Sequence, residues 1–141
     1  MIRLLVPVDG SKHSDKVIAH VIRLNRLCGP MEIHLVNVQE PADSPGVRRF
    51  RLPEQIRKQQ LEHGETFLRR ACSELEKAGV AFHAHVLIGD VPDTIVHLAA
   101  SRKCDHIVMG TRGQTGLRGL LLGSVASKVI RLATRPVTLI K

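Results

Sequence analysis

The alternation of short apolar segments with longer helical segments is the feature that most constrains how this chain folds. The apolar segments lie at residues 2–8, 32–38, 80–87, 106–109 and 137–140. Their lengths and continuous hydrophobicity are typical of strands that are covered on both faces. Each connection is long enough to hold a crossover helix. The pattern therefore predicts an α/β fold, with a parallel sheet and helices on both of its faces.

Helix start and stop signals lie at the expected places between these strands. Ser11 or Ser14 can cap a first helix, in which residues 17–28 carry an apolar stripe that Gly29-Pro30 ends.

Later helices show the same signals. Pro53 starts a long helix that ends at Gly79, and Asp90 caps another helix whose first turn contains Pro92. These signals place the helices between the strands, as the alternation requires.

A glycine-rich segment, residues 109–124, joins the fourth strand to the last helix. Gly110 and Gly113 lack a Cβ, so a ligand can approach the backbone closely and φ can be positive. Gly123-Ser124 opens a helix whose free N–H groups and dipole attract anions. Arg112 and Arg118 add positive charge. The segment predicts a cradle for a polyphosphate, and a flexible surface loop is the alternative.

The helix after this segment has apolar residues at helical spacing, which are Val125, Val129, Ile130 and Ala133. The glycine pattern itself is neither of the two common phosphate-binding motifs. No Gly-Lys pair occurs in the chain, which excludes a P-loop, and no Gly-x-Gly occurs, which excludes the dinucleotide fingerprint.

The first and fourth strands both end in polar turns. If these strands are neighbours, where the strand order reverses, both turns border one ligand crevice. Asp9 would then face the phosphate loop, where a carboxylate repels phosphate unless it meets a sugar hydroxyl or a metal. We therefore assign Asp9 to ribose or adenine recognition. Helix capping and turn formation are its alternative roles.

Composition narrows the class of protein. With 141 residues and 43% hydrophobic content, the chain can form one domain, residues 1–141, around a core. No apolar run reaches the roughly 18 residues of a membrane helix, and the three scattered cysteines form no Cys-x-x-Cys motif. We expect a soluble, cytoplasmic protein with no membrane partner.

The net charge of +8 favours anionic partners. A basic loop at residues 39–52 carries Arg48, Arg49 and Arg51, and we interpret it as a mobile loop. There is no recognised nucleic-acid motif, and Trp and Tyr are absent although single-strand binders use aromatic stacking. We expect no nucleic-acid partner.

His83 and His85 share one face of the third strand and could chelate a metal. No third ligand lies near them in sequence, so a solvated face is the preferred interpretation, and no protein-held metal site is assigned.

At this point the motifs resemble a known family. The spacing Gly110-x2-Gly113-x9-Gly123-Ser124 is similar to the nucleotide-binding signature of the ATP-binding branch of the universal stress protein family. Residues 2–9, 89–92, 105–113, 120–126 and 135–137 also resemble its characteristic stretches. One departure is Val36-Asn37-Val38, where the family often has His-Val.

The resemblance implies a Rossmann-like, five-stranded parallel sheet in the order 3-2-1-4-5, in a homodimer paired through the last strand. It implies ATP between strands one and four, with Mg²⁺ or Mn²⁺ bridging the phosphates. Adenine would lie against Pro7, Val8, Val38 and Met109, with Asp9 near the ribose or base. The phosphate residues implied are Gly110, Arg112, Gly113, Gly123, Ser124 and Val125.

Two functions fit such a site. One is a stress-response and signalling module in which nucleotide occupancy changes the dimer or a partner surface. The other is a slow ATPase or autokinase, which needs a base beside the phosphates and a carboxylate for magnesium. Asp105 and His106 are near in sequence, but we expect them to point elsewhere. No catalytic residue is assigned, and the binding module is the preferred hypothesis.

Overall fold

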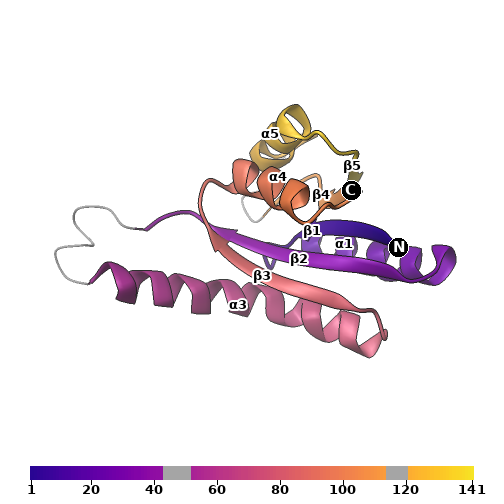
Figure 1. The fold of residues 1–141 in the computed structure, drawn as a ribbon, viewed down its shortest axis with the longest axis horizontal. Coiled ribbons are helices and arrows are strands. Elements are labelled where there is room, and N and C mark those ends of the chain that lie inside the picture. Colours follow the sequence, from indigo (N-terminus) through magenta and orange to yellow (C-terminus); the bar gives the residue numbers. More distant parts are fainter. Residues whose placement is uncertain (43–51, 114–120) are drawn as a thin grey trace.

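The computed structural model describes residues 1–42, 52–113 and 121–141 as one sheet between two layers of helix (Figure 1). Its strands are β1 (Ile2–Pro7), β2 (Met31–Gln39), β3 (Phe82–Ile88), β4 (His106–Gly110) and β5 (Val137–Ile140). All the paired strands are parallel, in the order β3-β2-β1-β4-β5. The predicted fold class and strand order are confirmed.

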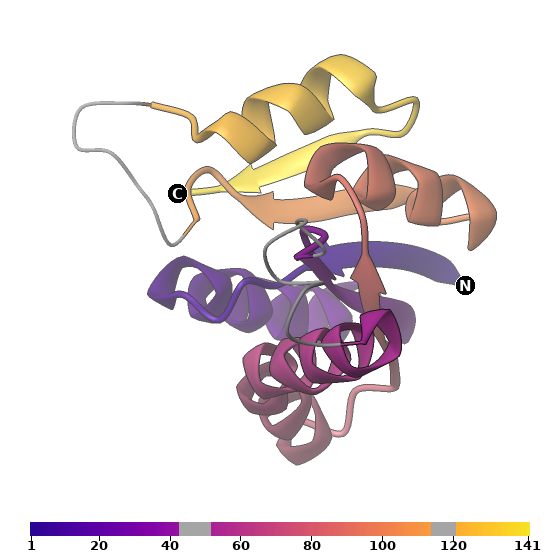
Figure 2. The same cartoon turned by 90° about the vertical axis from the view of Figure 1, so that its left-hand side faces the viewer.

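The helices lie on both faces of the sheet, as Figure 2 shows. One layer contains α1 (Lys12–Cys28) and α3 (Pro53–Lys77), and the other contains α4 (Val91–Ser101) and α5 (Ser124–Leu132). In the part of the chain that the structure describes, none of these helices is long and apolar enough to cross a membrane.

Each helical layer closes its own hydrophobic core against the sheet. On the α1/α3 side, Ile33 and Leu35 of β2 are fully buried, and on the α4/α5 side Leu5 and Ile107 are fully buried. Burying a side chain of this size contributes roughly 1.5–3 kcal/mol. Neighbouring residues of one strand, such as Leu4 and Leu5 of β1, are therefore buried in different cores. Both faces of the strand are covered, which explains why the strands are continuously apolar.

Side-chain caps fix where two of the helices begin. Ser11 Oγ accepts a hydrogen bond from Ser14 N–H (3.4 Å) at the start of α1. Asp90 Oδ2 accepts from Asp93 N–H (3.2 Å) at the start of α4. Both bonds satisfy donors that a helix start leaves unpaired, so the predicted caps at Ser11 and Asp90 are confirmed.

Three residues of the predicted apolar stripes are exposed instead. Leu27 lies six residues after Val21, about 240° around a helix of 3.6 residues per turn, and points away from the sheet with 70% exposure. Cys28 is exposed because it is the last residue of α1. Ile130 is 44% exposed because it lies one residue, about 100° of rotation, beyond the buried Val129.

Candidate functional site

The turn after β1 holds a carboxylate at the carboxyl edge of the sheet. Asp9 Oδ1 accepts hydrogen bonds from Ser11 N–H (2.9 Å) and from the Ser14 hydroxyl (2.8 Å). Ser14 Oγ in turn accepts from Asp9 N–H (3.1 Å). These bonds position the half-buried Asp9 side chain between the end of β1 and the start of α1.

The end of β4 is tied directly to the start of α5. Thr111 N–H donates to the Ile140 carbonyl (3.0 Å), and the Thr111 carbonyl accepts from Gly123 N–H (2.6 Å). Gly123 is the N-cap of α5, with φ −72° and ψ 166°. The two ends of the glycine-rich segment therefore meet at one point.

Four basic residues considered in the sequence analysis lie outside the described residues. They are Arg48, Arg49, Arg51 and Arg118.

The glycines are required here by crowding rather than by backbone conformation. Neither Gly110 nor Gly113 has a positive φ, so that part of the expectation is wrong. A Cβ on Gly113 would lie 2.7 Å from Asp9 Oδ2, and one on Gly123 would lie 3.3 Å from the Thr111 carbonyl oxygen. Glycine lets these segments approach one another closely.

A pocket opens between these turns, where β1 and β4 are neighbours at the reversal of strand order. We call it the β1–β4 pocket. All eleven residues predicted for the site line it. These are Pro7, Val8, Asp9, Val38, Met109, Gly110, Arg112, Gly113, Gly123, Ser124 and Val125.

Further lining residues were not predicted. They are Ser14, Val36, Asn37, Val91, Ile95, Thr111 and Ala126. From the sequence Ser14 is expected only to cap a helix. The α4 residues, Val91 and Ile95, come from a helix whose position over the pocket depends on the tertiary fold. Asn37 is buried and donates from Nδ2 to the Val8 carbonyl (2.8 Å), which ties the end of β2 to the end of β1. The signal in the sequence that could have identified Asn37 is its position between two apolar residues at the end of a predicted buried strand.

The pocket is lined by both apolar side chains and groups that attract anions. Val38 and Met109 provide an apolar region, while Ser124 and Val125 stand in the first turn of α5, where backbone N–H groups have no intrahelical acceptor. That turn contains no acidic residue. Among the described lining residues, Arg112 is the one basic side chain. The arrangement suits a ligand with a flat apolar part and an anionic part.

Asp105 and His106 lie away from this pocket. Asp105 is at the opposite end of β4, where its Oδ2 accepts from Arg3 N–H (2.8 Å). His106 pairs with Leu4 in the sheet and does not line the pocket. The expectation that both residues point elsewhere agrees with these positions.

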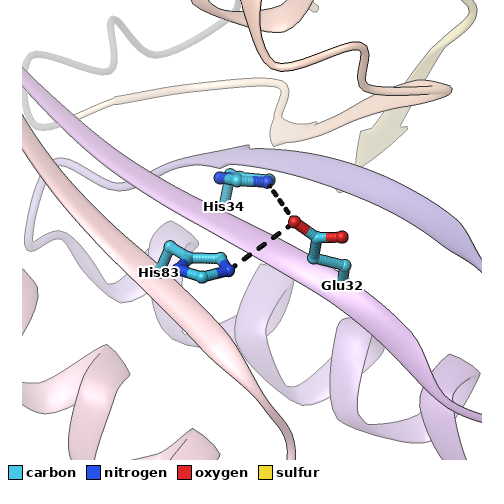
Figure 3. Close-up of side chains that lie close together, drawn as sticks. All are labelled: Glu32, His34 and His83. Atoms are coloured by element: carbon cyan, nitrogen blue, oxygen red, sulfur yellow. Dashed lines mark hydrogen bonds and ion pairs between the residues drawn. The ribbon is translucent and has the colours of Figure 1, made fainter.

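A second polar cluster joins β2 to β3. His83 is exposed, as expected, but His85 is partly buried and its Nε2 lies 3.0 Å from His34 Nδ1. His34 Nε2 lies 3.0 Å from Glu32 Oε1, and His83 Nε2 lies 3.6 Å from the same oxygen (Figure 3). Burial lowers the pKa of both the His34 and the His85 imidazoles.

Comparisons with known proteins agree with the motifs. The model of the universal stress protein family matches residues 1–141. Universal stress protein MJ0531 of Methanocaldococcus jannaschii is 34% identical over 141 residues, which cover 99% of this chain and 81% of the relative. The structure of MJ0577 superimposes with a TM-score of 0.87 at 27% identity, covering 99% of this chain and 95% of that one.

A second solved structure contains a nucleotide. It is the universal stress protein from Archaeoglobus fulgidus in complex with dAMP, which is 26% identical with a TM-score of 0.65. The alignment covers 100% of this chain and 98% of that protein.

Proposed function

Because the chain belongs to the universal stress protein family, we propose that it is an ATP-binding stress-response module whose nucleotide lies in the β1–β4 pocket. The observation that carries this proposal is the convergence of the β1 turn, the β4 end and the α5 start on one pocket. The adenine nucleotide bound by the Archaeoglobus fulgidus relative supports the same ligand class.

In this proposal the adenosine occupies the apolar part of the pocket. Pro7, Val8, Val38 and Met109 would contact the base, since each lines the pocket with an apolar side chain. The Asp9 carboxylate would accept hydrogen bonds from ribose hydroxyls. That role avoids the repulsion that a carboxylate would meet beside phosphate oxygens.

The phosphates would lie at the other part of the pocket. Gly110, Gly113 and Gly123 keep the backbone open to phosphate oxygens, and Ser124 and Val125 present N–H groups at the positive end of α5. Arg112 supplies a positive charge. Mg²⁺ or Mn²⁺ would be held by the nucleotide's phosphates and by water, and would neutralise part of their negative charge.

The signalling role would depend on a homodimer formed through β5. This strand is at the edge of the sheet, and all four of its residues are partly exposed. Pro136 and Ile140 carbonyls accept from β4 and its following turn, so by the two-residue period Val137 and Leu139 direct backbone groups to the open edge. An open edge of this kind pairs readily with a second copy.

We place the protein in the reducing cytoplasm. Cys28, Cys72 and Cys104 are free thiols, and burial raises the pKa of Cys72 and Cys104. Protonated thiols react slowly with disulfides and oxidants, so these two cysteines are suited to packing rather than to redox chemistry.

Slow ATP hydrolysis or autophosphorylation is the second candidate function. Among the described lining residues Asp9 is the one carboxylate, and it is already bonded to Ser11 and Ser14. Multiple-turnover phosphate release that is lost in Asp9→Asn would favour an enzyme. Bound ATP that stays intact favours the binding module.

Isothermal titration of the protein with ATP and magnesium tests the proposed function. We expect one site per chain with a micromolar dissociation constant, about −8 kcal/mol. Mass spectrometry of nucleotide released from the purified, denatured protein identifies the natural ligand. Absence of both co-purified nucleotide and measurable ATP binding would overturn the proposal.

A further inference from the structure

We propose that Glu32, His34 and His83 form a binding site for a zinc-class divalent cation, independent of the nucleotide pocket. The two strands β2 and β3 bring these ligands together on one face of the sheet. Glu32 and His34 are two residues apart on β2 and therefore point to the same side. His34 is directly paired with His83 on the neighbouring strand.

The ligand atoms converge closely enough to share an ion. Figure 3 shows both imidazoles directed at one carboxylate group of Glu32. Glu32 Oε1 lies 3.0 Å from His34 Nε2 and 3.6 Å from His83 Nε2, and all three ligand atoms lie within 4.8 Å of one another. Tetrahedral zinc, with bonds of about 2.0–2.1 Å, requires ligand separations of about 3.3 Å. The His34 and His83 rings are stacked, with centroids 4.9 Å apart and an interplanar angle of 20°, so the exposed His83 side chain must change rotamer to direct its Nε2 lone pair at the shared ion.

Neighbouring groups orient two of the ligands. His34 Nδ1 lies 3.0 Å from His85 Nε2, so a proton on Nδ1 donated to His85 leaves the Nε2 lone pair of His34 available to a metal. Arg3 Nε donates to Glu32 Oε2 (2.9 Å), which leaves Oε1 directed at the histidines. Metal-binding histidines and carboxylates are usually held by such outer hydrogen bonds.

The donor set selects the class of cation. Two imidazole nitrogens and one carboxylate oxygen are a common ligand set of zinc sites that keep a fourth position open, and magnesium and calcium prefer oxygen ligands. The His83 side chain is 60% exposed, and that of Glu32 is 28% exposed. The fourth position would therefore face solvent and hold water or an external ligand.

This site is separate from the nucleotide. Glu32 is six residues from Val38, which lines the β1–β4 pocket on the same strand. At about 3.3 Å per residue, the two positions are about 20 Å apart. A cation bridging ATP phosphates would therefore not occupy the Glu32–His34–His83 site, and zinc binding should not require nucleotide.

The competing explanation is a hydrogen-bonded cluster without a metal. In it, His34 and His83 donate Nε2 protons to Glu32, and Arg3 neutralises the carboxylate. The same atoms would then be close for reasons unrelated to zinc. Zinc binding by the protein separates the two explanations.

The test is a titration of EDTA-treated, nucleotide-free protein with zinc chloride alone. We expect one tight site per chain, weakened at least tenfold by His83→Ala and by Glu32→Gln. His63→Ala is the matched control, because His63 is also an exposed histidine but lies on α3, on the opposite face of the sheet. This control should bind zinc as the wild type does.

Cobalt(II) provides the second readout, since its visible absorption reports a tetrahedral site with nitrogen and oxygen ligands. We expect the spectrum in wild type and in His63→Ala, and its loss in His83→Ala. Unchanged circular dichroism of His83→Ala shows that the fold is kept. Equal zinc affinity in His83→Ala and wild type, or no saturable binding at all, would overturn the proposal whatever the result with ATP.

Discussion

Gly113 and Asp9 face one another so closely that a Cβ on Gly113 would lie 2.7 Å from Asp9 Oδ2. The two residues come from different strand ends, after β4 and β1, and both line the β1–β4 pocket. Their separation is set by the carboxylate, which Ser11 and Ser14 hold in place. The pocket therefore depends on glycine at residue 113 because of this neighbour.

Gly113→Ala should weaken ATP binding at least tenfold, since the new methyl group displaces the Asp9 carboxylate that would hold the ribose. Titration calorimetry with MgATP measures the effect. Gly89→Ala is a matched control: a Cβ there would be equally crowded, 2.6 Å from Thr94 Oγ1, but Gly89 does not line the pocket. Equal losses of ATP affinity in both variants would contradict a specific role for Gly113.

Ser124→Ala should lower ATP affinity by about tenfold, the effect of removing one hydrogen bond to a charged group, worth about 1.5 kcal/mol or more. Ser127→Ala, in the same helix, should leave the affinity unchanged. The Ser127 hydroxyl donates to the Gly123 carbonyl (3.0 Å), and Ser127 does not line the pocket. If the two variants bind ATP equally, the hydroxyl of Ser124 does not contact phosphate.

Arg112→Ala should weaken the binding of the phosphates without weakening the binding of the nucleoside. We expect ATP affinity to fall about tenfold, while adenosine affinity changes less than twofold, because in the proposed complex the guanidinium would interact with the phosphates alone. Arg131→Ala removes a charge at the far end of α5 and serves as the control. Competition binding at fixed ionic strength measures the affinities for ATP and for adenosine. Equal losses of affinity for the two ligands would show that Arg112 does not contact the phosphates.

Gly10→Ala should destabilise the protein by about 2 kcal/mol or more. Its φ is +78°, which costs an L-residue roughly 1–2 kcal/mol, and its Cβ would lie 2.5 Å from Phe67 Cδ1. Gly29→Ala shares the strain, with φ +91°, but meets no atom within 4 Å. Urea unfolding should therefore show a larger loss for Gly10→Ala. Equal losses would mean that Phe67 moves aside at no cost.

Leu139→Pro should convert the proposed dimer to a monomer. It removes the outward N–H that edge pairing through β5 would use, while Pro136 and Ile140 keep their bonds to β4 and its turn. Sedimentation analysis measures the mass, and circular dichroism checks the fold. A wild-type protein that is monomeric at all concentrations would contradict pairing through β5.

Much of the fold follows from local signals in the sequence. The predicted end of α3 at Gly79 is one example. Gly79 N–H donates to the Glu76 carbonyl and Val80 N–H to the Leu75 carbonyl, so the chain leaves the helix where the glycine indicated. Val80 itself is buried but precedes β3, because these bonds keep it in the helix cap rather than in the sheet.

Features that depend on strand pairing could not be predicted in the same way. In the sequence, no third ligand lies near His83 and His85, so the pattern favours a solvated face over a metal site. Glu32 and His34 are about 50 residues away in the chain and meet His83 only through the β2–β3 register. Likewise, the sequence predicted that Asp9 faces the phosphate loop only if β1 and β4 are neighbours, and it could not predict how closely Asp9 approaches Gly113.

The central claim is that a nucleotide lies between the β1 turn and the start of α5. A crystal structure of the protein grown with ATP and magnesium tests it most directly. We predict electron density for a triphosphate against Gly113, Ser124 and Val125, with the adenine between Val38 and Met109. Nucleotide bound elsewhere, or a β1–β4 pocket that stays empty at saturating ATP, would contradict the account.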